Sequence, residues 1–150
     1  MNIIKIVQLS HFDKNFPLPQ LETPGSAGAD LRVSFEDKGQ YEVTPGEKIL
    51  LPTGLKMEIP QGYEVQIRPR SGMSLNTPMM VVNAPGTIDA DYRGEIKIIM
   101  GNMGNESYVI KHGDRVAQMV FSKVFSYTFE VVQEISDTDR SVGGFGSTGK

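Results

Sequence analysis

Apolar and polar positions alternate along most of the chain with the period of two that is typical of β-strands. Between residues 55 and 59, and again between 63 and 68, every second residue is apolar. Each of these strands therefore has one buried and one wetter face, as the strands of antiparallel sheets do. Apolar runs predict further strands at 3–7, 41–43, 47–51, 79–82, 96–100, 108–110, 115–121 and 128–132.

Turn residues between these runs predict β-hairpins. Pro45-Gly46 and Pro60-Gln61-Gly62 each separate two strands. A third hairpin is predicted from the apolar residues 79–82 and 96–100, with a polar tip at 83–95. The pattern as a whole predicts an all-β domain with many short connections.

Composition agrees with one folded domain and restricts the cellular locations expected for it. The chain has 150 residues, of which 39% are hydrophobic and 22% charged, and this is typical of a globular protein. No apolar run approaches the roughly 20 residues that span a bilayer, and the first residues do not resemble a signal peptide. Cysteine is absent, which excludes disulfides and thiolate metal sites and favours a cytoplasmic location. We therefore expect no membrane partner.

The formal charge of −3 argues against a protein that coats nucleic acid. It does not exclude a small anionic ligand, because local donors decide such binding. After residue 68 the strand pattern stops, since Pro69 has no N–H for a sheet, and Ser71 suits a chain reversal or the start of one helical turn. Arg70, Ser71 and the free N–H groups around them form a plausible cradle for an oxyanion.

Other polar groups interrupt the strands at four more places. The tip at 83–95 carries Asn83, the carboxylate of Asp89 and the ring of Tyr92. Gln118 lies within an apolar strand, where its amide needs either a backbone or a ligand partner. Asp30 marks a loop that becomes a strand, and the C-terminal segment, rich in glycine, adds arginine, phenylalanine and hydroxyl groups. His11 is interpreted as an ordinary surface residue.

These groups together fit a nucleotide bound at a site with a general base. The phosphate donors lack the spacing of a P-loop, and no cluster of histidine and carboxylate residues has metal-ligand spacing. The serines have no histidine assigned to them as a catalytic partner. A nucleotide site without a dedicated protein metal centre is therefore expected.

The polar segments that interrupt the strands resemble, in the same order, the motifs of the trimeric deoxyuridine triphosphate nucleotidohydrolases (dUTPases). The resemblance runs from about residue 20 to the C-terminus. It is carried by PGSAGADL (24–31), PRSGMS (69–74), NAPGTIDADYRGEI (83–96), GDRVAQMVF (113–121) and RSVGGFGSTG (140–149). Two residues depart from the pattern: Ser141 stands where glycine is common, and Ser74 where alanine is common.

The resemblance implies a role for each matching residue. Asp89 would be the general base that activates water, and Tyr92 would pack under the deoxyribose and exclude a 2′-hydroxyl. The uracil would be read by Asn83, Gly86, Thr87, Ile88 and Lys97. The phosphates would be held by Arg70, Ser71, Gly72 and Gln118. The residues that close over the substrate would be Arg140, Phe145, Gly146, Ser147 and Thr148, with Phe145 covering the uracil. Asp30 would support the site without touching the substrate.

The same resemblance implies the architecture and the reaction. Residues 1–136 would form a distorted β-barrel or jelly roll, and 137–150 a flexible arm that closes over the site. Homotrimers would share active sites between subunits. Such a trimer would hydrolyse dUTP to dUMP and pyrophosphate, keeping uracil out of DNA, with Mg²⁺ held by the triphosphate and waters and not by protein ligands. Two alternatives are a dCTP deaminase of the same fold and a nucleotide-sensing regulatory protein without catalysis.

Overall fold

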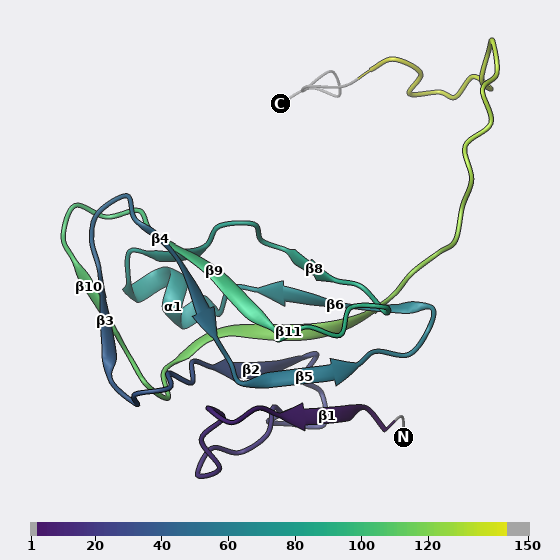
Figure 1. Ribbon diagram of the computed structural model, residues 1–150. Coiled ribbons are helices and arrows are strands. Elements are labelled where there is room, and N and C mark those ends of the chain that lie inside the picture. The colour runs from purple at the N-terminus through teal and green to yellow at the C-terminus, as the bar shows by residue number, and fades with distance from the viewer. Residues whose placement is uncertain (1–2, 144–150) are drawn as a thin grey trace.

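Strands dominate the computed structural model, which describes residues 3–143 (Figure 1). The described residues form eleven strands and one short helix. In chain order these are β1 (Lys5–Gln8), β2 (Gly28–Arg32), β3 (Gln40–Val43), β4 (Lys48–Pro52), β5 (Leu55–Glu58), β6 (Tyr63–Arg68), α1 (Ser71–Asn76), β7 (Met79–Val81), β8 (Gly86–Ile88), β9 (Lys97–Asn102), β10 (Tyr108–Lys111) and β11 (Arg115–Lys123). The all-β class is confirmed.

Four antiparallel sheets surround one core. The larger two have the strand orders β2-β11-β6-β8 and β4-β9-β7, and the smaller two pair β1 with β5 and β3 with β10. The predicted alternation holds in β5 and β6, where Met57, Val65 and Ile67 are buried between more exposed polar neighbours. The core also contains Leu31, Ile98, Met100, Ile110 and Val116. Burial of these side chains supplies the main stabilisation, because each removes apolar surface from water.

The predicted hairpins are confirmed at one place and wrong at two. β7 and β9 do pair, with Val81 opposite Met100. However, β3 pairs with β10 and β4 with β9, while β5 pairs with β1 and β6 with β11 and β8. The Pro-Gly turns reverse the chain, but each following strand joins a different sheet. A turn sequence determines local direction only, and burial of both faces decides which strands pair.

The tip of the confirmed hairpin forms a strand of its own. Residues Gly86–Ile88 form β8, which pairs with β6 and thereby joins the other large sheet. The polar tip is thus held between two sheets. One helical turn after Pro69 is also confirmed, since α1 begins at Ser71 and buries Met73 in the core. No helix within the described range could cross a membrane.

The strand predicted at 128–132 is wrong. After β11 the described chain to residue 143 has no regular secondary structure, and Figure 1 shows it running away from the sheets. Phe129 and Val131 are 91% and 99% exposed. An apolar run becomes a strand only where another strand offers backbone partners, and this segment has none within the described residues of the chain.

Candidate active site

A pocket of about 240 Å³ lies between the polar tip and the strands β6 and β9. It brings together Asn83, Gly86, Thr87, Ile88, Tyr92 and Lys97, all predicted to read the base or the sugar. Gly86 fits closely here, since a Cβ would lie 3.1 Å from the Asn83 amide nitrogen and 3.4 Å from the Ile67 side chain, so a larger residue would require these neighbours to shift. Apolar walls with a few polar groups are typical of a small-molecule site.

Asp89 lies directly after β8 and follows Ile88, a residue of the pocket wall, and its side chain is exposed. The carbonyl of Asp89 accepts a hydrogen bond of 3.1 Å from the Tyr92 N–H, which closes a tight turn around the two residues. The Tyr92 ring folds back along the loop, and its hydroxyl donates to the Glu95 carbonyl at 3.0 Å. The turn thus carries a carboxylate and an aromatic ring within four residues.

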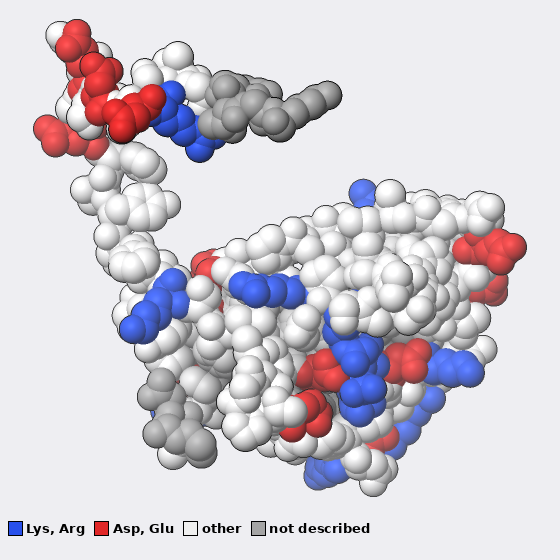
Figure 2. All heavy atoms as spheres, turned by 180° about the vertical axis from the view of Figure 1, so that it is seen from behind, with Lys and Arg blue, Asp and Glu red and all other residues white. Residues whose placement is uncertain are grey.

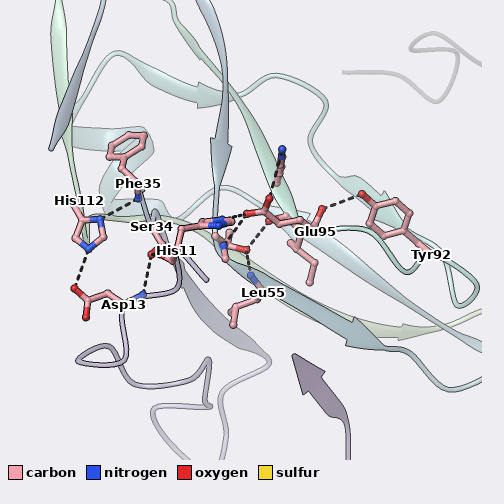
Figure 3. Close-up of polar contacts among 12 residues, drawn as sticks. His11, Asp13, Ser34, Phe35, Leu55, Tyr92, Glu95 and His112 are labelled. Carbon is pink, nitrogen blue, oxygen red and sulfur yellow. Dashed lines mark hydrogen bonds and ion pairs between the residues drawn. The ribbon is translucent and has the colours of Figure 1, made fainter. Parts of the chain in front are cut away.

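His11 is not an ordinary surface residue, contrary to the sequence interpretation. Its Nε2 lies 2.8 Å from Glu95 Oε1, and the two side chains are only 19% and 12% exposed (Figure 3). The Gly54 N–H donates to the same oxygen at 2.8 Å. Burial raises the pKa of Glu95, but the His11 and Gly54 hydrogen bonds outweigh it and hold the pKa below the ordinary value.

A second polar group lies where β6 leads into α1. The Arg70 Nε donates to Asp30 Oδ1 at 2.7 Å, and Arg115 Nη1 donates to Asp30 Oδ2 at 3.1 Å. Ser71 and Gly72 open the helix and are exposed. The group presents a guanidinium, a hydroxyl and free N–H groups, which are suitable donors for phosphate. The Asp30 carboxylate fixes the orientation of the Arg70 side chain through this hydrogen bond.

Gln118 finds a backbone partner, one of the two possibilities left open by the sequence. Its Nε2 donates to the Pro69 carbonyl at 2.9 Å, which ties β11 to the residue before Arg70. The side chain also packs over Gly28, where any Cβ would overlap the Gln118 amide oxygen. Gln118 therefore supports the backbone that carries Arg70.

The two polar groups lie toward opposite ends of β6 within one chain. Val65 pairs with Ile88 and Ile67 with Gly86, so Asp89 lies level with about residue 64. Arg70 follows six residues later, which corresponds to about 20 Å at the usual rise of a strand. Figure 1 shows α1 and the loop after β8 at these two ends. The described chain therefore separates the predicted base from the predicted phosphate donors.

The last predicted segment is described only in part. Arg140 is exposed, and its Nε donates to the Gly143 carbonyl at 2.9 Å. Ser141, which stands where the family commonly has glycine, has a φ of 42° in the left-handed region that favours glycine. Phe145, Gly146, Ser147 and Thr148 lie outside the described residues.

The charged groups do not form a dedicated metal centre in the described part of the chain, where no three histidine or acidic residues are placed to hold an ion. Mg²⁺ commonly binds through substrate phosphates, waters and one or two carboxylates. The described residues offer no ligand cluster that would compete with binding of Mg²⁺ through substrate phosphates and waters. On the face seen in Figure 2, basic side chains lie among acidic ones and form no broad basic surface.

The fold and the pocket together define a β-protein with a small pocket of mixed apolar and polar lining. Comparison with known proteins identifies its family. The dUTPase family profile matches residues 14–149. The chain is 54% identical over 137 residues to a deoxyuridine 5′-triphosphate nucleotidohydrolase of Roseobacter denitrificans, covering 91% of this chain and 90% of the relative. The chain belongs to the dUTPase family.

Solved structures agree with this assignment. A mutant dUTPase of Staphylococcus bacteriophage 80alpha with dUpNHpp has a TM-score of 0.86 at 25% identity, and the match covers 100% of both chains. A mutant dUTPase of phage phi11 of S. aureus, described as revealing the coordination of a structural Mg(II) ion, has a TM-score of 0.76 at 24% identity. This match covers 89% of this chain and 98% of the phage chain and supports the fold. The expected dUTPase-like architecture is therefore confirmed.

Sequence reasoning did not select three residues that the structure places against the site. Glu95 and Arg115 lie within the matched motifs, so the motifs themselves are the signal that could have pointed to these two residues. His11 had no such signal, because its partner Glu95 is 84 residues away. A contact between such distant positions follows only from the tertiary fold.

Proposed function

We propose that this chain hydrolyses dUTP to dUMP and pyrophosphate, since its relatives are named deoxyuridine 5′-triphosphate nucleotidohydrolases. The observation that supports this most directly is the pocket of about 240 Å³, in which Asn83, Tyr92 and Lys97 meet beside the exposed Asp89. Its lining of apolar side chains with a few polar groups suits a base and a sugar. The cytoplasmic location expected from the absence of cysteine stays a prediction.

In the proposed reaction Asp89 accepts a proton from a water molecule that attacks the α-phosphorus. Water is a poor nucleophile, and a positioned general base typically contributes about 10² to 10⁴ in rate. The bond between the α-phosphorus and the bridging oxygen breaks, and pyrophosphate leaves. When bound with the triphosphate, Mg²⁺ supplies charge neutralisation at the phosphate oxygens. The fit of Asp89 to this role rests on its exposure at the end of β8.

Selectivity is proposed to come from the walls of the pocket. Gly86 lets Asn83 approach β8 closely, so a hairpin of this shape leaves little room for the 5-methyl group of thymine. Amide and backbone groups matched to the uracil edge would leave unpaired polar atoms against cytosine, which costs affinity. Tyr92 is proposed to lie under the deoxyribose and exclude a 2′-hydroxyl.

The active site is proposed to form between subunits of a homotrimer. Within one chain, Asp89 and Arg70 lie about 20 Å apart along β6, so a single subunit does not present the base and the phosphate donors to one triphosphate. Exposed aromatic residues after β11 also favour association. The arm beginning at Arg140 is proposed to complete the site over the substrate with Phe145, Gly146, Ser147 and Thr148.

Complementation between inactive variants tests the shared site. Asp89→Asn and Arg70→Ala subunits are refolded separately and as an equal mixture, and pyrophosphate release from dUTP is measured. If each site takes these residues from two subunits, about one quarter of the sites in the mixture recover both native residues. A mixture no more active than its components would contradict the shared site, and ultracentrifugation checks the trimer.

The choice of substrate distinguishes the proposed dUTP hydrolase from the alternative, a dCTP deaminase. The wild-type chain is incubated with dUTP, dCTP, dTTP and UTP, and pyrophosphate and ammonia are both measured. Pyrophosphate from dUTP alone is expected. Ammonia from dCTP without pyrophosphate from dUTP would overturn the proposed reaction, whereas binding of dUTP without any product would favour a nucleotide sensor.

A further inference from the structure

The Glu95 side chain connects the pocket to two segments that lie outside it. Its Oε1 accepts hydrogen bonds of 2.8 Å from His11 and from the Gly54 N–H, while Lys97 Nζ lies 3.5 Å from Oε2. Neither His11 nor Gly54 lines the pocket, whereas Glu95 and Lys97 do. One carboxylate thus joins the loop after β1 and the turn before β5 to a pocket wall.

The direction of the His11 hydrogen bond follows from the chemistry of its partner. The pKa of Glu95 lies below its ordinary value, so the carboxylate is ionised at neutral pH and only accepts hydrogen bonds. His11 Nε2 therefore carries the proton and donates it. A charge-assisted bond of this kind, largely shielded from water, is stronger than a bond between neutral groups.

The backbone of Glu95 in turn holds the Tyr92 ring. The Tyr92 hydroxyl donates to the Glu95 carbonyl at 3.0 Å (Figure 3). The ring lies so close over Gly94 that a Cβ there would overlap the hydroxyl. The Ile96 N–H donates to the Leu55 carbonyl at 2.8 Å, which anchors the next residue as well. Movement of Glu95 would therefore move the Tyr92 ring.

We propose that His11 is a positioning residue that acts through Glu95 to hold the Tyr92 ring as the wall that selects deoxyribose over ribose. This inference rests on the proposed contact of Tyr92 with the sugar. His11 itself does not reach the substrate. Loss of its hydrogen bond removes one of the contacts that hold the Glu95 side chain, leaving the Gly54 and Lys97 contacts, and the weakened hold lets the loop shift and makes room for a 2′-hydroxyl.

The experiment measures kcat/KM for dUTP and for UTP. The readout is kcat/KM for dUTP divided by kcat/KM for UTP, the selectivity ratio. His11→Ala is expected to lower the ratio about tenfold, the scale of one lost charge-assisted hydrogen bond. His11→Gln keeps an N–H donor and is expected to restore much of the ratio. A ratio for His11→Gln as low as that for His11→Ala, or an unchanged ratio in His11→Ala, would overturn the proposal.

His112 provides a matched control. It is the only other histidine of the chain. Its Nε2 lies 3.2 Å from Asp13 Oδ2, and its side chain is 10% exposed. This pair lies away from the pocket lining (Figure 3). His112→Ala is expected to lower Tm without changing the ratio. Equal loss of the ratio in both alanine variants would indicate general loosening and overturn the specific role of His11.

Tyr92 variants separate this inference from the function on which it rests. Tyr92→Ala should lower the ratio, and failure to do so would contradict the sugar contact itself. Tyr92→Phe removes only the bond to the Glu95 carbonyl. If His11 acts through this wall, the effect of His11→Ala is largely absent in the Tyr92→Phe background, since the two changes break one chain of contacts. Additive effects would overturn the inference and leave the proposed hydrolysis intact.

Discussion

Arg70 donates its Nε to Asp30 Oδ1 at 2.7 Å, and both side chains are largely shielded from solvent. The second Asp30 oxygen accepts from Arg115 Nη1 at 3.1 Å, so one carboxylate holds two guanidinium groups. The Arg70 Nη1 also donates to the Arg115 carbonyl at 3.2 Å. This arrangement orders an arginine that would otherwise sample many rotamers.

Replacement of Asp30 by asparagine is expected to weaken substrate binding. The amide turns an N–H₂ group toward one guanidinium, so Arg70 loses a charged partner and its fixed orientation. We expect kcat/KM for dUTP to fall about tenfold or more, on the scale of a hydrogen bond to a charged group. Steady-state kinetics measure this change.

Glu58→Gln is a suitable control for the Asp30 variant. It removes a carboxylate from an exposed ion pair with Lys5, and exposed pairs contribute little to stability. Kinetic constants close to wild type are expected for Glu58→Gln. If Asp30→Asn also retained wild-type kinetics, Asp30 would not position Arg70 for the substrate.

Asp89→Asn should retain dUTP binding and lose turnover, because the amide no longer accepts a proton from water. A decrease in kcat of about 10² to 10⁴ is expected from loss of a general base. Calorimetric binding and pyrophosphate release measure the two properties separately. Asp91→Asn removes the same charge from the same exposed loop and should leave kcat within a few fold. A similar decrease in kcat in both variants would mean that the negative charge of the loop, and not a general base at Asp89, is needed for turnover.

Removal of residues 140–150 should impair hydrolysis without unfolding the protein. Among the described residues 3–143 the buried core contains no residue after Met119, so loss of the described part of the arm does not expose core side chains. We expect an unchanged Tm and a decrease in kcat/KM of about 10²-fold, the scale on which poor positioning of a substrate lowers rates. A large loss of Tm would show that the arm stabilises the fold.

Acid should weaken the contribution of Asp13 to stability. The Asn15 N–H and the Lys38 ammonium group, together with His112, hold the pKa of Asp13 well below its ordinary range. A lowered folded-state pKa stabilises the fold above the unfolded value of about 3.9, and this stabilisation disappears as pH falls below that value. Asp13→Asn is therefore expected to lower Tm by a few degrees at pH 7.

The difference in Tm between wild type and Asp13→Asn should become smaller below about pH 4, where the unfolded wild-type chain begins to bind the proton. Thermal unfolding between pH 3 and pH 7 measures this. A difference that stays constant over the whole range would mean that packing, and not the charge of Asp13, causes the loss of stability.

Much of the fold class was readable from the residues because alternation and turn signals are local properties. The buried positions Met57, Val65 and Ile67 follow directly from a period of two. Strand partners were not readable in this way. The strands around Pro60-Gln61-Gly62 looked like a hairpin, yet they join different sheets, since pairing depends on which arrangement buries the apolar faces of the whole chain.

The sequence by itself determined the family and the chemical groups available to the site, because ordered motifs and side-chain types are properties of the chain. Only the tertiary structure decided that Asp89 and Arg70 lie toward opposite ends of β6 and that Glu95 joins His11 to Tyr92. The physical reason is that these relationships depend on strand register and on contacts between distant positions. Neither is encoded in the spacing of residues along the chain.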